Sequence, residues 1–189
     1  IYKFILEIYR IMSNQLIVKA VNFAAQKHSK QRRKDEDASP YINHPISVAM
    51  FISDIGKVDD PEVLAAALLH DTLEDTKTTP EELVDNFGNR VCKMVQEVTD
   101  DKSLPKMERK QRQIEHAKEI SEGAALIKLG DKISNVTDIT NTPPTDWANE
   151  RRLEYFEWAE EVINNCPKVN TLLEKYFKDS IQKGRKKLQ

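Results

Sequence analysis

The sequence predicts an all-α fold: a single domain built as a bundle of roughly eight to ten helices. Apolar residues recur at helical spacing along most of the 189 residues, and no run alternates apolar and polar residues over a useful strand length. Only 5 glycines are present, and typical start and stop residues separate the apolar stripes. A chain of this length can bury a core of its own, so a second folded domain is not required.

Start signals define the helices in the first half of the chain. Ser13 or Asn14 can cap the first helix. Thr79 and Pro80, with Glu82 three residues after the cap, form the clearest signal, because a capping hydroxyl precedes proline at the first helical position. The first predicted helix covers residues 13–28, and residues 29–40 form a loop. The second covers 46–55, with Pro45 in its first turn and Gly56 at its end. Three more follow: one opened by Asp60-Pro61-Glu62, one over 80–87 and one around 91–98.

The second half of the chain contains four more predicted helices. Leu104-Pro105 starts a highly charged one, and Gly123 precedes an apolar one. Thr142-Pro143-Pro144 is a break, and Pro167 divides the last two helices. The predicted ranges are 105–120, 124–139, 146–164 and 168–182, followed by a basic tail over residues 183–189 that we expect to fray.

Three segments are expected along the chain: an N-terminal extension over residues 1–11, the folded domain over residues 12–182, and the basic tail. The apolar residues at positions 1, 4, 5, 8, 11 and 12 fall on one helical stripe, but Met12-Ser13-Asn14 fits a start followed by a helix cap. The extension is therefore predicted to lie outside the domain and to be dispensable for activity.

Composition excludes several classes of function. The net charge of −2 argues against general nucleic-acid binding and leaves room only for local basic patches. No stretch is long and apolar enough to span a bilayer, and the N-terminus lacks the layout of a signal peptide. Cys92 and Cys166 are too few for a disulfide framework and lack metal-site spacing, which indicates a reducing compartment and hence a cytoplasmic location.

The segment 65–76 is the most informative part of the sequence. An apolar run leads directly into His70 and Asp71, and Glu74 and Asp75 follow. On a continuous helix residues four apart share a face, so His70 would lie over Glu74, and Asp71 over Asp75. Because buried charge is costly unless it is compensated, this cluster predicts a divalent metal ion, with the second carboxylate pair close enough to act on a water molecule.

Two further residues complete a candidate set of metal ligands. His44 stands at the start of a predicted helix, and Asp131 lies in an otherwise apolar helix. Each has an ordinary alternative, since His44 alone fits a capping or core histidine better, and Asp131 alone can face solvent. Together, the four ligands supply two nitrogens and two carboxylates, a set that suits Mn²⁺, Fe²⁺ or Zn²⁺; they are His44, His70, Asp71 and Asp131.

Several short segments surround these ligands: Arg32-Arg33-Lys34, Pro40-Tyr41-Ile42-Asn43-His44-Pro45, His70-Asp71-Thr72-Leu73-Glu74-Asp75-Thr76, Phe87-Gly88, Val98-Thr99, Leu129-Gly130-Asp131-Lys132 and Tyr155-Phe156. The ligand order resembles the H…HD…D signature of the HD phosphohydrolases. With these segments the chain, over about residues 14–180, resembles the alarmone (ppGpp) hydrolases of the RelA/SpoT homologue family. Its length is similar to that of the small stand-alone members, including the metazoan SpoT homologues.

The resemblance implies an HD-domain helical bundle that hydrolyses the 3′-diphosphate of ppGpp or pppGpp to GDP or GTP and pyrophosphate, with one Mn²⁺ ion per chain. It assigns Glu74 and Asp75 to the family's catalytic acidic pair, which we expect to orient and deprotonate the attacking water. From the charge and hydropathy given above we expect no nucleic-acid or membrane partner, and no obligatory protein partner is evident. The resemblance also implies that the substrate is bound by Arg33, Lys34, Tyr41, Lys106, Asn135, Arg151 and Tyr155.

Two positions depart from the family pattern. Gly130 stands where alanine is usual, and Ser134, at a position expected close to the nucleotide pocket, stands where many relatives have histidine or tyrosine. Two alternatives therefore stay open. An HD phosphohydrolase acting on another phosphorylated nucleotide would release orthophosphate, whereas a non-catalytic alarmone sensor would bind its ligand without turnover and would not need the Glu74–Asp75 pair.

Overall fold

The chain folds almost entirely into α-helices, which confirms the predicted all-α class. The computed structural model describes the backbone of residues 2–189 and the side chains of residues 7 and 10–189. Within this part a single isolated bridge, between Arg32 and Pro40, is the only extended pairing. In chain order the helices are α1 (Tyr2–Lys27), α2 (Asn43–Met50), α3 (Pro61–Leu69), α4 (Thr72–Asp75), α5 (Pro80–Phe87), α6 (Asn89–Val98), α7 (Lys106–His116), α8 (Glu122–Asn141), α9 (Asn149–Asn165) and α10 (Thr171–Leu188), with a π-helical turn η1 (Phe51–Ile55) after α2 and a 3₁₀ turn η2 (Ala117–Glu119) after α7.

Two apolar clusters share α8. Helix α3 is apolar on all sides, and its residues Val63–Leu69 are all buried, so it forms the centre of the first cluster between α1, α2, α6 and α8. The second cluster joins α8 to α9, α10 and η1, with Phe156 and Leu173 fully buried. Because α8 supplies Ile127 to one cluster and Ile133 to the other, it is fixed on both sides.

Local capping forms where the sequence predicts it. The Asp60 carboxylate accepts the backbone N–H groups of Glu62 at 3.0 Å and Val63 at 3.4 Å, at the start of α3. The Thr79 hydroxyl accepts the N–H of Glu82 at 3.3 Å, at the start of α5. Gly88 ends α5 with φ = +85°, a conformation that favours glycine. These signals are reliable because the capping side chain and the backbone N–H that donates to it lie within four residues of each other.

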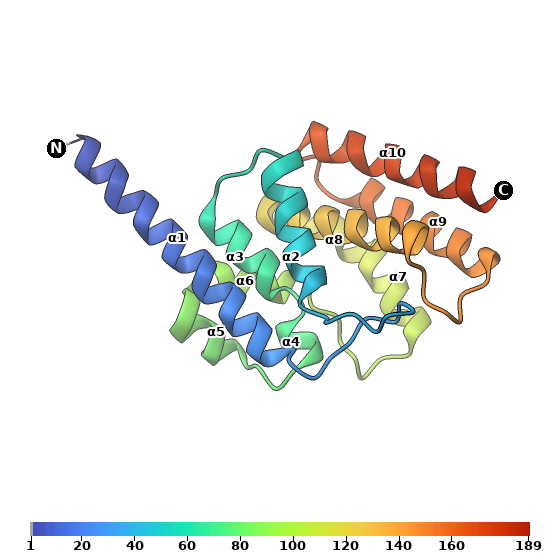
Figure 1. Cartoon of the computed structure of the whole chain (residues 1–189), viewed down its shortest axis with the longest axis horizontal. Coiled ribbons are helices and arrows are strands. Elements are labelled where there is room, and N and C mark those ends of the chain that lie inside the picture. Colours follow the sequence, from blue (N-terminus) through green and yellow to red (C-terminus); the bar gives the residue numbers. More distant parts are fainter. Residues whose placement is uncertain (1) are drawn as a thin grey trace.

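The first helix differs from its prediction. A start at Ser13 or Asn14 is wrong, because α1 continues without interruption from Tyr2 to Lys27 and projects beyond the helical body at its N-terminal end (Figure 1). Ile11 and Met12 are exposed. The side chains at positions 1, 4, 5 and 8 of the predicted apolar stripe lie outside the described residues. Ser13 and Asn14 are residue types that can cap a helix, but in a continuous helix the backbone N–H groups that a cap would accept are bonded within the helix.

The second helix begins three residues earlier than predicted, at Asn43, so His44 lies within its first turn. Its end at Gly56 is as predicted, but the last turn is π-helical, with the Gly56 N–H donating to the Phe51 carbonyl at 3.1 Å. A Cβ at Gly56 would lie 2.8 Å from a Leu173 methyl carbon of α10, so close packing favours glycine here.

The predicted fraying of residues 183–189 is also wrong, because α10 extends to Leu188. Gly184 is buried, and a Cβ there would lie 2.7 Å from both the Phe156 ring and the Thr140 hydroxyl. The guanidinium of Arg185 pairs with the Glu160 carboxylate of α9. The tail is helical because it docks on α8 and α9, a contact that local sequence patterns do not report.

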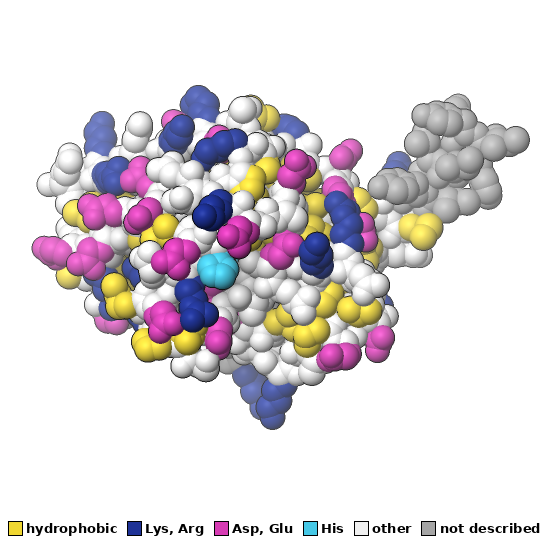
Figure 2. All heavy atoms as spheres, turned by 180° about the vertical axis from the view of Figure 1, so that it is seen from behind, with side chains coloured by type: hydrophobic (Ala, Val, Ile, Leu, Met, Phe, Trp, Pro, Cys, Tyr) yellow, Lys and Arg dark blue, Asp and Glu magenta, His cyan; other side chains and the backbone are white. Residues whose placement is uncertain are grey.

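The surface carries charges of both signs. Figure 2 shows basic and acidic side chains interleaved with apolar ones over the face opposite to that of Figure 1, without a continuous basic surface. Among the described residues, no helix combines the length and the apolar character needed to cross a bilayer.

Candidate metal centre and active site

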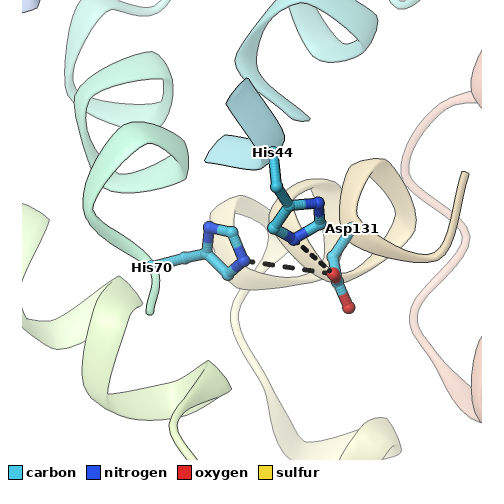
Figure 3. Close-up of side chains that lie close together, drawn as sticks. All are labelled: His44, His70 and Asp131. Atoms are coloured by element: carbon cyan, nitrogen blue, oxygen red, sulfur yellow. Dashed lines mark ion pairs between the residues drawn. The ribbon is translucent and has the colours of Figure 1, made fainter. Parts of the chain in front are cut away.

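Three of the four predicted metal ligands converge in a buried cluster (Figure 3). His44 comes from the first turn of α2, His70 from the residue after α3, and Asp131 from the middle of α8. Their ligand atoms lie within 4.8 Å of one another, and Asp131 Oδ1 is 3.2 Å from His44 Nε2 and 4.0 Å from His70 Nε2. Three elements far apart in sequence thus present two nitrogens and an oxygen to one point.

Asp71, the fourth predicted ligand, lies beside this group. Its Oδ2 is 3.0 Å from His70 Nε2 and 3.8 Å from His44 Nε2. The continuous helix expected through this segment is wrong: α3 ends at Leu69, and Asp71 has φ = −95° and ψ = −1°, in a sparsely populated region common at active sites. The Thr72 hydroxyl donates a hydrogen bond to the Leu69 carbonyl at 2.6 Å, which satisfies that carbonyl at the break.

The imidazole of His70 fits a metal ligand by its hydrogen bonding. Its Nδ1 lies 2.8 Å from the Ala67 carbonyl, which can only accept, so Nδ1 carries the proton. In the neutral ring Nε2 then presents its lone pair to the cluster. That atom is buried and has no hydrogen-bond partner, since Asp71 Oδ2 approaches it without hydrogen-bond geometry. Metal-binding histidines characteristically donate their other ring nitrogen to a carbonyl in this way.

The charges of the cluster favour a cation. Burial opposes the charged form of His70, but the carboxylates of Asp71 and Asp131 outweigh it and raise the pKa of His70 to about 9. Burial likewise opposes ionisation of Asp131, but Lys132 and the two histidines hold the pKa of that carboxyl well below its usual range. Two buried carboxylates therefore stay ionised, and a divalent cation can replace the compensating proton on His70.

Neighbouring side chains fix both carboxylates. The Asn135 amide donates to Asp131 Oδ1 at 2.6 Å, and the buried Lys132 ammonium lies 3.0 Å from Asp131 Oδ2 and 4.3 Å above the Trp158 ring. The Tyr41 hydroxyl donates to Asp71 Oδ2 at 2.6 Å. Sequence reasoning missed Lys132, although its place next to Asp131 in an apolar helix signals a buried ion pair. It did not anticipate the bond between the Tyr41 hydroxyl and Asp71, a candidate metal ligand; the role of Tyr41 in substrate binding stays a prediction.

Ser134, which departs from the family pattern, lies next to the candidate metal ligand His44. The residue is buried, and its hydroxyl oxygen lies 3.1 Å from His44 Nδ1. This contact orients the His44 ring so that Nε2 faces Asp131.

Glu74 and Asp75, the predicted catalytic pair, lie on the short helix α4. The Glu74 carboxylate accepts the backbone N–H of Asp100 at 3.1 Å, and Arg109 approaches its other oxygen to 3.9 Å. Burial and the nearby carboxylates raise the pKa of Glu74 to about 7. Asp75 is held by the Gln31 amide, which donates to Oδ2 at 2.7 Å, and by the Lys102 ammonium at Oδ1. Glu74 is thus suited to accept a proton near neutral pH.

A cavity of about 620 Å³ opens beside the cluster, with His44 and Asp75 in its wall. Five of the seven predicted substrate residues line it: Arg33, Lys34, Tyr41, Asn135 and Tyr155. The Arg33 guanidinium donates to Asp138 at 2.6 Å and to Asn135 at 3.3 Å. The cavity therefore combines basic groups, the three aromatic rings of Tyr41, Trp147 and Tyr155, and an edge of the candidate ligand cluster.

Lys106 and Arg151 do not line this cavity. Lys106 is exposed at the start of α7. The Arg151 guanidinium lies 3.5 Å from Asp146 and 4.3 Å above the Trp147 ring. Trp147 itself lines the cavity, and its ring centroid is 5.9 Å from that of Tyr155, so Arg151 stands behind the wall. Their roles in substrate binding stay predictions.

Comparison with known proteins gives consistent matches. The profile of the HD domain family matches residues 20–155. Guanosine-3′,5′-bis(diphosphate) 3′-pyrophosphohydrolase MESH1 of Xenopus tropicalis is 53% identical over 84% of this chain and 89% of its own length, and the Homo sapiens protein of the same name is 49% identical over 86% and 90%. A solved structure described as a metazoan ortholog of SpoT that hydrolyzes ppGpp superposes with a TM-score of 0.85 and 45% identity, over 88% of this chain and 94% of that one.

Proposed function

The chain belongs to the HD-domain family of guanosine-3′,5′-bis(diphosphate) 3′-pyrophosphohydrolases, and we propose on this premise that it hydrolyses ppGpp and pppGpp. Water adds across the bond between the 3′ oxygen and the adjacent phosphorus. The hydroxide joins that phosphorus, pyrophosphate leaves, and the 3′ oxygen takes a proton to give GDP or GTP.

One observation carries this assignment in the structure. The unpartnered Nε2 of His70 faces a buried His44–Asp131 pair, and this group adjoins a cavity whose wall holds Arg33 and Lys34. Guanidinium and ammonium groups bind phosphate, whereas the histidine–carboxylate group suits a cation. A substrate with a diphosphate at the cluster and further phosphate and base in the cavity satisfies both.

His44, His70, Asp71 and Asp131 are the residues proposed to hold the metal ion, with Mn²⁺ as the expected ion and Fe²⁺ or Zn²⁺ as alternatives. The absence of cysteine from the set and the mixture of imidazole and carboxylate ligands support this choice. A bound divalent cation would neutralise charge on the diphosphate and lower the pKa of the attacking water.

The protein's own residues supply the remaining steps. Glu74 accepts the proton of the attacking water, because its raised pKa lies close to neutral pH and its carboxylate is fixed by the Asp100 N–H. Asp75 orients that water from a carboxylate whose two oxygens are both held. Arg33 and Lys34 bind phosphate at the cavity wall.

The other substrate residues complete the nucleotide site in this proposal. Asn135 and Tyr155 contact the nucleoside from the wall formed by α8 and α9, and Tyr41 contributes its ring, since its hydroxyl is bonded to Asp71. Lys106 and Arg151, which do not line the cavity, are proposed to bind outer phosphates that extend beyond it. Their flexible side chains can reach a bound ligand that carries several negative charges.

A product assay tests the function. Purified full-length protein is incubated with labelled ppGpp in Mn²⁺ or in chelator, alongside pppGpp and a panel of nucleoside monophosphates and triphosphates. Pyrophosphate and GDP formed only with metal are the expected result. Orthophosphate from another nucleotide would replace this function with that of a phosphomonoesterase. Tight ppGpp binding without turnover at saturating Mn²⁺ would identify a sensor.

Residues 12–182 are proposed to form the catalytic unit, acting in the cytoplasm on a free nucleotide without nucleic acid, membrane or an obligatory protein partner. Residues 1–11 are proposed to be dispensable, although they continue α1. A chain that begins at Met12 is expected to keep kcat and KM for ppGpp within about twofold of the full chain, since the described residues of the cluster and cavity all follow it. Loss of turnover in a folded truncated protein would contradict this boundary.

A further inference from the structure

His28 is a buried histidine to which the proposed function gives no role. It directly follows α1, only 2% of it is exposed, and its Nδ1 lies 2.7 Å from the side-chain oxygen of Gln31. Its other ring nitrogen, Nε2, is buried without a hydrogen-bond partner. A buried polar ring therefore makes a single side-chain hydrogen bond, and that bond is directed at Gln31.

The direction of each hydrogen bond follows from donor and acceptor chemistry. The Gln31 side chain also contacts Asp75, with Nε2 placed 2.7 Å from Oδ2. A carboxylate can only accept, so the amide nitrogen of Gln31 faces Asp75 and its oxygen faces His28. That amide oxygen can only accept as well, so the proton of His28 is on Nδ1. The chain of donation runs from His28 to Gln31 and from Gln31 to Asp75.

We infer that His28 and Gln31 are positioning residues that hold the Asp75 carboxylate in the orientation required for turnover. The inference rests on the proposed function, in which Asp75 orients the attacking water. Gln31 acts on Asp75 directly. His28 acts through Gln31, because its N–H selects one of the two amide orientations, and the reversed amide would present oxygen to a carboxylate.

The surroundings hold this arrangement rigid. The His28 ring packs against the Tyr41 ring with centroids 5.0 Å apart, and the Tyr41 hydroxyl is bonded to Asp71. On the other side of Asp75, Lys102 binds Oδ1 from a half-exposed position. Gln31 is thus the contact of Asp75 with the protein interior, and Lys102 is its contact on the solvent side.

Substitutions in the full chain separate the two roles. Q31M keeps the length of the side chain and removes both hydrogen bonds, H28F keeps an aromatic ring against Tyr41 and removes the donor, and H28N keeps a donor of similar reach. We expect kcat for ppGpp at saturating Mn²⁺ to fall about tenfold or more in Q31M and about fivefold in H28F, with KM within about twofold in both. H28N is expected to recover most of the kcat lost in H28F.

The double variant is the decisive measurement. Because His28 acts through Gln31, H28F/Q31M is expected to have the kcat of Q31M alone. Two matched controls, Q26M on the exposed side of α1 and H116F on α7, are expected to leave kcat unchanged. Independent, multiplicative losses in the double variant would overturn the relay. So would unchanged kcat in both single variants, and a rise in KM alone would instead make Gln31 a substrate contact.

Failure of the proposed function can be distinguished from failure of this inference, because the unsubstituted protein would then release no pyrophosphate. The arrangement is tested without activity by the imidazole ¹⁵N spectrum of the unsubstituted protein, which is expected to show His28 protonated at Nδ1 and to change at His28 in Q31M. A ring protonated only at Nε2 would overturn the inference, and this measurement does not depend on whether H28F folds.

Discussion

Replacing Glu74 by glutamine is expected to remove activity and to stabilise the protein. Both effects follow from a carboxyl group whose burial raises its pKa from 4.5 to about 7. In its proposed role as proton acceptor Glu74 cannot be replaced by an amide, so we expect kcat to fall by about 100-fold or more. The glutamine oxygen can still accept the Asp100 N–H, so the fold at α4 is kept.

The gain in stability can be estimated from the same pKa. A rise from 4.5 to about 7 corresponds to about 3 kcal/mol at 1.36 kcal/mol per pH unit. The side chain is 19% exposed, and solvent screening reduces this to about 2 kcal/mol. For a protein of this size that gain raises Tm by about 4–8 °C.

The difference in stability between E74Q and the unsubstituted protein is expected to grow as the pH rises. Below pH 4.5 Glu74 is protonated in the folded and the unfolded chain, so E74Q and the unsubstituted protein should be equally stable with respect to this group. Between pH 4.5 and 7 only the unfolded chain releases the proton, which lowers the free energy of unfolding of the unsubstituted protein. Above pH 7 the variant should be more stable by the full amount.

The assay is denaturant or thermal unfolding of both proteins at pH 4.5, 6 and 8. Chelator is present throughout, because a bound cation would itself lower the pKa of Glu74. E74D serves as the ionisable control. A variant that is no more stable than the unsubstituted protein at pH 8 would refute the burial argument, and a metal-loaded E74Q with near-normal turnover would refute the catalytic role.

Three further predictions concern the metal, the substrate and the fold. H70A should weaken Mn²⁺ binding by at least about 100-fold, measured by calorimetry, because even residues that only support a ligand contribute about 10- to 100-fold; unaltered binding would remove His70 from the ligand set. R33A should raise KM for ppGpp about tenfold with kcat within about threefold, whereas K30A, outside the cavity, should change neither; equal effects in both variants would indicate general electrostatics. G184A should lower the free energy of unfolding by about 1–2 kcal/mol, since overpacking against Phe156 exceeds the gain of about 1 kcal/mol in helix propensity; a stabilised variant would mean that the end of α10 is undocked.

Much of the site could be predicted from the sequence: the candidate metal ligands from the residue pattern, and the substrate residues from the resemblance to a known family. His44, His70 and Asp131 were placed in one cluster by their order and chemistry, and the structure brings them within reach of one ion. Five of seven expected substrate residues line one cavity. Lys132, Ser134, His28 and Gln31 were missed as supports, because their partners are ordinary residues whose significance depends on distance in space.

The sequence by itself determined the helices and the kind of chemistry. Caps such as Asp60 and Thr79 act over two or three residues, and a stripe of apolar side chains specifies a buried face, so both are encoded locally. The residue types of the cluster likewise identify a cation site whatever their exact geometry.

Tertiary structure decided where helices stop and what each polar group binds. The helical end of the chain depends on the docking of Gly184 against Phe156 and Thr140, which outweighs the local preference for fraying. The break at Asp71 likewise interrupts a segment whose local pattern favours a continuous helix. Gln31 meets Asp75 across 44 residues, and Arg33 meets Asp138 across 105. Contacts at such separations depend on how the helices pack around α8, and no pattern within a few residues carries that information.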